Sequence, residues 1–124
     1  MKRTANAIWK GNGKDGKGTL STQSTLLSNA QYSYKSRFEQ GVGTNPEELI
    51  AAAHAGCFAM KLSFALQAMN FTADSLDVQA EVTLEDGTIT LSALTLKASI
   101  PGISAAQFKE ASEDAKLNCP VSKL

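Results

Sequence analysis

The alternation of hydrophobic and polar positions predicts a β-hairpin in the second half of the chain. Apolar residues occupy every second position from Leu76 to Leu84, and a second alternating run extends from Ile89 to Ile100. Between the two runs stands Asp86-Gly87, a pair that favours two-residue hairpin turns. The second run changes phase at Ala93-Leu94, which predicts a β-bulge at that point.

A long helix is predicted from Pro46 to about Met69, because start signals precede a nearly continuous apolar run. Asn45 can cap the helix, proline suits the first helical position, and Glu48 stands at the capping-box position. The middle of the helix consists mostly of alanine and glycine. Small side chains let another backbone come close, which offers a packing reason for Gly56 inside a helix.

Shorter segments complete the pattern. Residues 4–9, Thr19 to Thr22 and Tyr32 to Phe38 are β-prone and predict a small antiparallel sheet, and residues 104–117 predict a second helix that opens with a capping box. The order strands, long helix, hairpin, helix indicates an α+β fold in a single domain. Two small sheets around one helix that is rich in alanine and glycine would leave apolar surface uncovered in a single copy, so we expect a homodimer.

Charge and composition exclude several classes of partner. The chain has 124 residues with 12 basic and 12 acidic side chains, and this balance argues against nucleic acid or an anionic membrane as a partner. We find no signal peptide and no apolar stretch that we expect to span a bilayer, so cytoplasm is the expected compartment. The chain has one histidine, no cluster of metal-ligating residues and no phosphate-binding glycine loop. We therefore expect neither a metal nor a cofactor.

The two cysteines, Cys57 and Cys119, are the strongest candidates for chemistry. In a reducing compartment such cysteines are either reactive or simply buried as small apolar groups. Cys57 lies inside the long helix, where His54 or Lys61, one turn away, could lower the pKa of its thiol. Cys119 precedes Pro120, which places it at the edge of a helix or outside it. A reversible disulfide and two inert thiols both remain open at this point.

Arg37 and Glu47 are the charged candidates, although a solvated surface position is the usual role of such residues. Ten residues separate Glu47 from Cys57, which corresponds to about 15 Å along a straight helix. Glu47 therefore cannot contact Cys57 directly. A link between them requires a long side chain such as Arg37, a bent helix or a dimer partner.

Four sequence blocks together resemble the OsmC/Ohr family over essentially the whole chain. They are Arg37-Phe38-Glu39, the run from Gly43 to Ile50, the run from Ala53 to Phe58, and Cys119-Pro120-Val121-Ser122. The first and third blocks resemble the osmotically inducible OsmC branch. Members of the family have an arginine that a glutamate orients. In the organic hydroperoxide resistance (Ohr) branch this arginine comes from the glycine-rich N-terminal loop, where this chain has Lys14 and Lys17 instead.

The resemblance implies an intertwined α+β homodimer with two long central helices and antiparallel sheets outside them. The family continues past the cysteine-proline block into a closing β-strand, whereas this sequence stops at Leu124. We therefore expect one OsmC-like domain over residues 1–124 without that strand, and with an exposed sheet edge in its place.

The resemblance also implies a thiol peroxidase that reduces organic hydroperoxides, and hydrogen peroxide less well. In that reading Cys57 is the peroxidatic cysteine, Cys119 resolves its sulfenic acid as a disulfide, and Glu47 orients Arg37. A dithiol, of lipoyl type or similar, would restore both thiols. Candidate contacts for an alkyl tail, each of which could equally be ordinary core, are Phe38, Phe58, Met60 and Phe64.

Two other classes of function compete with the peroxidase. One is a redox-sensing or small-molecule-binding domain that keeps the fold without turnover, and the other is a dimeric structural protein with two inert thiols. The presence of both cysteines together with Arg37 and Glu47 favours the peroxidase.

Overall fold

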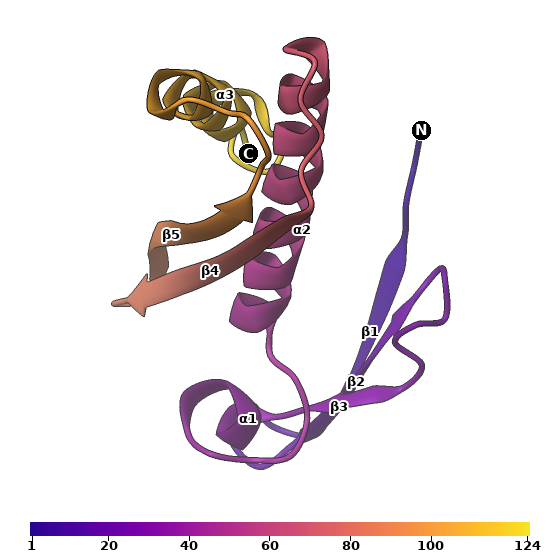
Figure 1. The fold of residues 1–124 in the computed structure, drawn as a ribbon. Helices are drawn as coiled ribbons and strands as arrows, with labels where there is room; N and C mark the ends of the chain where they lie inside the picture. Colours follow the sequence, from indigo (N-terminus) through magenta and orange to yellow (C-terminus); the bar gives the residue numbers. More distant parts are fainter. The chain divides into compact units, whose positions relative to one another are not determined.

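The computed structural model describes all residues, 1–124, and confirms the α+β class (Figure 1). Its elements are β1 (Ala5–Lys10), β2 (Lys17–Thr22), β3 (Ala30–Tyr32), α1 (Tyr34–Phe38), α2 (Pro46–Ala68), β4 (Ser75–Glu85), β5 (Thr88–Ser99) and α3 (Ala105–Asn118). The chain forms two compact parts, Met1–Leu49 and Ile50–Leu124, here called the N-terminal part and the C-terminal part. Helix α2 begins in the first part and continues into the second.

The N-terminal part contains an antiparallel sheet in the order β1-β2-β3, as the β-prone segments predicted. The rings of Trp9 and Tyr32 lie 5.4 Å apart, centroid to centroid. Gly18 lies beneath both rings, where even a single added methyl group would collide with them. Strand β1 is exposed along its whole length, so the sheet has little core of its own.

The predicted strand from Tyr32 to Phe38 is wrong. Strand β3 ends at Tyr32, and the short helix α1 follows it. Ser33 caps this helix: its hydroxyl accepts from the amide of Ser36 at 3.2 Å, and the hydroxyl of Ser36 accepts from the amide of Ser33 at 2.8 Å. This reciprocal capping satisfies the free amides of the first turn and outweighs the β preference of the tyrosines.

Helix α2 begins as predicted and ends within a residue of the expected point. Asn45 caps it, because its side-chain oxygen accepts from the amide of Glu48 at 2.8 Å. Glu48 does not complete the predicted capping box. Its carboxylate accepts instead from the hydroxyl of Thr44 at 2.6 Å, which ties the loop to the first turn of the helix.

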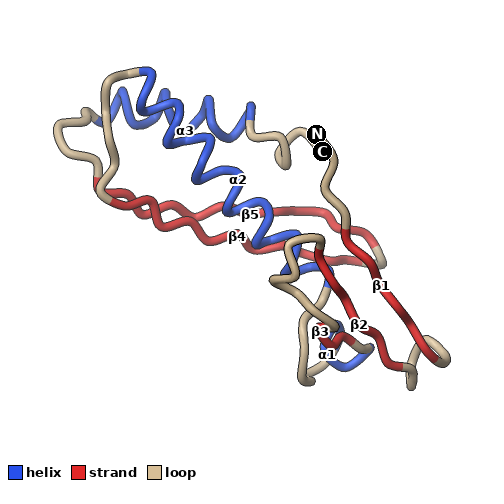
Figure 2. The backbone as a smooth tube through the Cα atoms, turned by 90° about the vertical axis from the view of Figure 1, so that its right-hand side faces the viewer, coloured by secondary structure: helices blue, strands red, loops and turns tan.

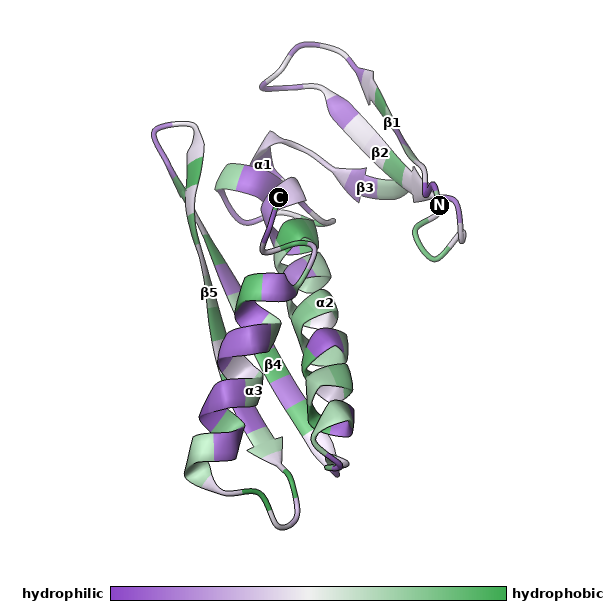
Figure 3. Ribbon diagram, turned by 90° about the horizontal axis from the view of Figure 1, so that it is seen from above, coloured by the Kyte–Doolittle hydropathy of each residue, from purple (hydrophilic) through white to green (hydrophobic).

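The composition of α2 corrects the expectation that no apolar stretch of this chain is long enough to span a bilayer. With 23 residues and a mean hydropathy of 1.6, this helix is long and apolar enough to cross a membrane by length and composition alone. Figure 3 shows the helix predominantly in hydrophobic colours, whereas α3 carries broad hydrophilic segments. One stripe of α2 is buried as in the core helix of a globular domain, and it consists of His54, Phe58, Leu62 and Leu66.

The C-terminal part contains the predicted hairpin of β4 and β5. Its turn pairs Glu85 with Thr88, and Asp86 and Gly87 between them have positive φ angles of 49° and 74°. Both central residues of a type I′ turn need such angles, which asparagine, aspartate and glycine adopt most readily. The Asp-Gly signal in the sequence was therefore sufficient to locate this turn.

The bulge lies elsewhere than predicted. The register shifts beside Thr83 and Leu84, near the turn, and the pairing is regular through Ala93 and Leu94. This bulge nevertheless explains the change of phase in the sequence. Leu84 pairs with Ile89 and Thr83 with Leu91, so Thr90 is the extra residue on β5, and the positions opposite Leu84 and Val82 change from odd to even numbers. Ser92, opposite Val82, is a polar residue on that face, so the apolar pattern resumes only at Leu94.

The core of the C-terminal part lies between the hairpin and two helices. Helices α2 and α3 lie on the same face of β4 and β5 (Figure 2). The fully enclosed residues are Phe58, Leu62 and Leu66 from α2, with Ala111, Ala115 and Cys119 from α3 and its end. Apolar side chains of the hairpin pack against this cluster, among them Val78 and Leu94. A cysteine is thus part of the core itself.

Candidate active site

The two cysteines meet at the junction of α2 with the end of α3. Their sulfur atoms lie 2.8 Å apart, and both are free thiols. Cys57 is half-buried, whereas Cys119 has no exposed surface. A pair so arranged exposes one sulfur to a reactant and keeps the second within reach of the first. The sequence left open whether Cys57 and Cys119 can form a disulfide. Their separation in the structure makes that bond geometrically accessible.

The packing of α3 explains how Cys119 reaches this place. Ala111, Ala115 and Cys119 follow one another at intervals of four residues, so they share one face, and all three are buried. Cys119 is the C-terminal cap of α3, and its amide donates to the carbonyl of Ala115 at 2.9 Å. Pro120 then prevents further helix. This confirms the predicted position of Cys119 at a helix edge.

The two thiols affect each other's ionisation. Burial, and then the neighbouring sulfur of Cys119, raise the pKa of the Cys57 thiol. Burial alone would raise the pKa of Cys119 as well, but hydrogen bonds from Cys57 and from Ser122 outweigh it and lower that pKa. One negative charge is therefore stabilised on the pair, while the second proton is held more firmly.

The surroundings of the thiols differ from the prediction in part. The charge of Lys61 lowers the pKa of Cys57, as expected, but His54 bonds to Ser92 and Ser122 instead. Sequence reasoning missed the amides of Val121 and Ser122, which act as hydrogen-bond donors that lower the pKa values of the two thiols. The available signal was the proline after Cys119, since it forces a turn whose amides need acceptors.

Arg37 and Glu47 form a two-point ion pair within the N-terminal part. Nε and Nη2 of Arg37 donate to Oε1 of Glu47 at 2.9 and 2.8 Å, and the guanidinium lies 5.0 Å from the ring of Phe38. Burial would raise the pKa of Glu47, but its hydrogen bonds with Arg37 and the positive charge there lower it. The remaining nitrogen, Nη1, makes no hydrogen bond and can serve an anion.

Local hydrogen bonds hold this ion pair in place. The hydroxyl of the buried Ser36 donates to the carbonyl of Thr44 at 2.8 Å, and the side-chain Nδ2 of Asn45 donates to the backbone carbonyl of Ser36 at 3.0 Å. Helix α1 is therefore fastened to the start of α2. Arg37 and Glu47, one on each helix, consequently face each other across a fixed loop.

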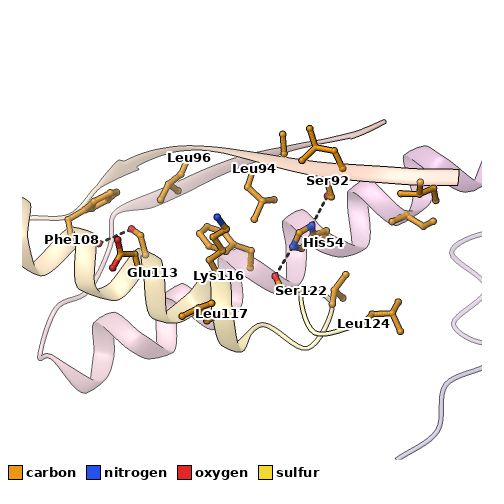
Figure 4. A pocket seen from close by; sticks show the side chains of 17 residues that line it. His54, Ser92, Leu94, Leu96, Phe108, Glu113, Lys116, Leu117, Ser122 and Leu124 are labelled. Carbon is orange, nitrogen blue, oxygen red and sulfur yellow. Dashed lines mark hydrogen bonds between the residues drawn. The ribbon is translucent and has the colours of Figure 1, made fainter. Parts of the chain in front are cut away.

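An apolar groove of about 1020 Å³ runs between the hairpin, α2 and α3 of the C-terminal part (Figure 4). Leu94, Leu96 and Phe108 supply part of its lining, and His54 and Ser122 lie between Phe108 on one side and Leu124 on the other. Val121, whose amide lowers the pKa of Cys57, also lines it. An apolar surface thus extends from the neighbourhood of the thiols.

The structure separates the four predicted alkyl contacts. Phe58 is enclosed in the core and lines the groove. Met60 and Phe64 are 65% and 59% exposed on another face of α2, and Phe38 belongs to the N-terminal part, where it is half exposed. The groove brings in residues that the sequence did not indicate, because they come from β5 and α3.

Comparison with known proteins places this arrangement in a family. A family model described as "OsmC-like protein" matches residues 39–124. Peroxiredoxin OsmC of Escherichia coli strain K12 is 45% identical over 122 residues, which cover 95% of this chain and 85% of the relative. The chain belongs to the OsmC family. The same identity and coverage hold for Peroxiredoxin OsmC of Shigella flexneri.

Solved structures agree with membership of the OsmC family. The organic hydroperoxide resistance protein OhrB of Bacillus subtilis is 25% identical and superposes with a TM-score of 0.69, over 97% of this chain and 88% of that one. An OsmC-like protein of Mycoplasma pneumoniae has a TM-score of 0.75 at 16% identity, over 99% of this chain and 86% of that one. The latter shows likeness of fold alone.

The mutual influence of the thiols yields a first prediction. Cys119→Ala removes a neighbour that raises the pKa of Cys57, so the pKa of Cys57 should fall. Alkylation of the remaining thiol by iodoacetamide, measured against pH, should show its midpoint moved downward. Adding Lys61→Gln in the same background should move the midpoint back up, since the charge of Lys61 lowers this pKa. An unchanged or raised midpoint in Cys119→Ala would contradict the coupling.

Proposed function

We propose that this chain is a thiol-dependent peroxidase that reduces organic hydroperoxides. The observation that carries the proposal is the contact of 2.8 Å between a half-buried and a fully buried free thiol. The kinship with proteins named peroxiredoxin and organic hydroperoxide resistance protein supports the same chemistry. The function inferred from the sequence thus has a structural basis in the thiol pair.

The proposed cycle begins at Cys57, which is the accessible sulfur of the pair. Its thiolate attacks the distal oxygen of the peroxide, the O–O bond breaks, and the alkoxide leaves and takes a proton to become the alcohol. The sulfenic acid of Cys57 then receives the sulfur of Cys119. An S–S bond forms, the S–O bond breaks, and hydroxide leaves and is protonated to water. A dithiol, for which we propose a lipoyl-type compound, reduces the disulfide by exchange.

Arg37 and Glu47 are proposed as the electrostatic partners of this reaction, on the strength of the family resemblance. Glu47 fixes two nitrogens of the guanidinium, which leaves Nη1 available for the peroxide or for the developing negative charge. The lowered pKa of Glu47 keeps it ionised at neutral pH. The ion pair is lost only as the pH falls through that lowered pKa, below the ordinary range of a glutamate.

Apolar side chains near the thiols favour an alkyl hydroperoxide over hydrogen peroxide. We keep Phe38, Phe58, Met60 and Phe64 as proposed contacts of the alkyl tail. Phe58 has the best support, because it follows Cys57 directly and lines the apolar groove. We further propose one domain over residues 1–124, a cytoplasmic location without a membrane partner, and chemistry that needs no metal or cofactor.

Turnover measurements test the proposed peroxidase. The native chain should consume tert-butyl hydroperoxide when reduced lipoamide is supplied, and Cys57→Ser should abolish this activity because no sulfenic acid can form. Cys119→Ser should react with peroxide once and then stall, because its sulfenic acid has no partner. NADPH oxidation, coupled through a lipoamide reductase, records all three rates.

The contrary outcome is also informative. A folded native chain whose thiols are oxidised by the peroxide but that shows no dithiol-dependent turnover would favour the redox-sensing alternative. Slow and equal alkylation of both thiols, with no response to peroxide, would favour inert buried cysteines.

A second prediction concerns the ion pair. Arg37→Ala should lower kcat/KM for tert-butyl hydroperoxide by about a hundredfold, the usual effect of losing one donor that stabilises transition-state charge. Arg37→Lys should recover only part of this loss, because an ammonium cannot hold Glu47 with two nitrogens. Lys35→Ala, an exposed change on the same helix, is the matched control and should have no effect. Full activity of Arg37→Ala would remove Arg37 from the mechanism.

The exposed face of α2 supports the proposal of a homodimer. Ala52, Ala53 and Gly56 lie exposed there together with Met60 and Phe64, so the face is apolar and made largely of small residues. Such residues allow two helices to approach closely. An added Cβ at Gly56 would meet nothing within 4 Å in the chain, so a larger side chain there is tolerated within one protomer.

Gly56→Leu should therefore convert the dimer to a monomer that still folds. Light scattering after size-exclusion chromatography measures the mass, and circular dichroism measures the fold. Ala106→Leu adds the same exposed leucine on α3 and should leave the dimer intact. A Gly56→Leu chain that remains dimeric, or a native chain that is monomeric, would show that α2 does not form this interface.

A further inference from the structure

Cys119 is held beside Cys57 by the packing around it. None of its surface is exposed, and it belongs to the same enclosed cluster as Ala111 and Ala115. Its amide donates to the carbonyl of Ala115 at 2.9 Å, and its carbonyl accepts from the amide of Lys123 at 3.2 Å. The sulfur of Cys119 therefore has little room to turn away from the sulfur of Cys57, which lies 2.8 Å from it.

Only one of the two sulfurs is open to a reductant once they have formed a disulfide. Cys57 is half-buried on α2, whereas Cys119 is enclosed in the core. The site of thiol–disulfide exchange depends on which sulfur the incoming thiolate can reach. A thiolate that attacks Cys119 would have to approach through the core, so the reductant attacks Cys57, and Cys119 is the group that leaves.

The first exchange step follows from this difference in access. The thiolate of the reductant forms a bond to the sulfur of Cys57, the bond between Cys57 and Cys119 breaks, and Cys119 leaves as a thiolate that takes a proton. The product is a mixed disulfide between Cys57 and the reductant. Because the core still holds Cys119 in contact with Cys57, the reverse attack is available as soon as this mixed disulfide forms.

The reverse attack competes with the second exchange step. In the reverse attack the thiolate of Cys119 bonds to the sulfur of Cys57 and expels the reductant. In the second step a thiolate attacks the reductant's own sulfur, and Cys57 leaves as a thiolate. Groups held in contact react as if their concentration were far above that of any solute. A second monothiol molecule cannot match this rate, whereas the second thiol of a dithiol is itself intramolecular and closes a cyclic disulfide.

We propose that Cys119 selects the reductant, because it returns a monothiol adduct of Cys57 to the disulfide and lets only a dithiol complete the exchange. The inference rests on the proposed peroxidase cycle and concerns its last step. Cys119 is then a specificity-determining residue as well as the resolving one. The reductant that fits is a compound whose two thiols can close a small ring. Each turnover oxidises one such dithiol to its cyclic disulfide and reduces the disulfide of the chain to two thiols.

The dependence of the reduction rate on thiol concentration tests the proposal. Diamide, which is reduced to the hydrazine as it oxidises two thiols, prepares the disulfide of the full chain without peroxide. Either 2-mercaptoethanol or dithiothreitol is added, and alkylation with mass spectrometry records the return of free thiols. Doubling 2-mercaptoethanol should raise the rate about fourfold, and doubling dithiothreitol about twofold, because only the monothiol is needed twice. At equal millimolar concentration dithiothreitol should be faster by at least about a hundredfold.

Two matched variants separate the roles of the two sulfurs. Each is treated with hydroxyethyl disulfide, which transfers one half to a reactive cysteine and releases the other half as 2-mercaptoethanol. Cys119→Ser should keep the adduct on Cys57, and added 2-mercaptoethanol should remove it at a rate linear in concentration. Cys57→Ser should gain the adduct on the enclosed Cys119 at least about tenfold more slowly. The native chain should retain no adduct and should end as the disulfide.

Several results would overturn the proposal. They are a native reduction rate that is linear in 2-mercaptoethanol, a native chain that retains the adduct on Cys57, equal rates of adduct formation in the two variants, and a chain in which diamide forms no disulfide. The arm that uses diamide needs no peroxidase activity. If tert-butyl hydroperoxide leaves both thiols free but the disulfide made with diamide shows the expected dependence, the proposed function fails and the selection by Cys119 stands.

Discussion

The contact between the sulfur atoms of Cys57 and Cys119 is the constraint on which the rest of the C-terminal part depends. At 2.8 Å the two thiols require α2 and the end of α3 to meet within one side-chain length. Ala111 and Ala115 make this approach possible, because larger side chains on that face of α3 would hold it away from α2. Phe58 and Leu62 close the same junction from the α2 side.

Burial and ionisation oppose each other at this junction. An apolar core disfavours a thiolate, and burial raises the pKa of both thiols before any other effect is counted. The turn after Pro120 offsets this effect with the amides of Val121 and Ser122, and Lys61 adds a positive charge. The end of α3 therefore supplies both the second sulfur and the donors that stabilise its charge.

Local signals allowed much of the fold to be predicted from the sequence. The caps at Asn45 and Ser104 and the Asp-Gly turn act within a few residues, so they located α2, α3 and the hairpin correctly. Helix α1 was missed because the capping between Ser33 and Ser36 competes with the β preference of the tyrosines. The resemblance of short blocks to a known family named Cys57 and Cys119, and the structure brings these two together.

Tertiary contacts account for what the sequence could not provide. The change of phase in β5 was assigned to a bulge at Ala93-Leu94, whereas the bulge lies beside Leu91. The apparent position was displaced because the inward residue after the bulge is polar: Ser92 is hydrogen-bonded to His54, 38 positions away. His54 was considered a neighbour of Cys57 one helical turn away, yet its ring turns toward Ser122, 68 positions distant. No periodicity along the chain encodes such partners, because they depend on how the hairpin and the C-terminal turn fold back onto α2.

We propose that the two thiols form a redox pair: the peroxide is reduced to the alcohol while Cys57 and Cys119 are oxidised to a disulfide. Intact-mass analysis with peptide mapping, after one equivalent of tert-butyl hydroperoxide and rapid blocking of free thiols, tests it most directly. We expect the chain to lose two hydrogen atoms and a single linked peptide to join Cys57 to Cys119. A chain that retains an added oxygen on Cys57, or that keeps both thiols free, would contradict it.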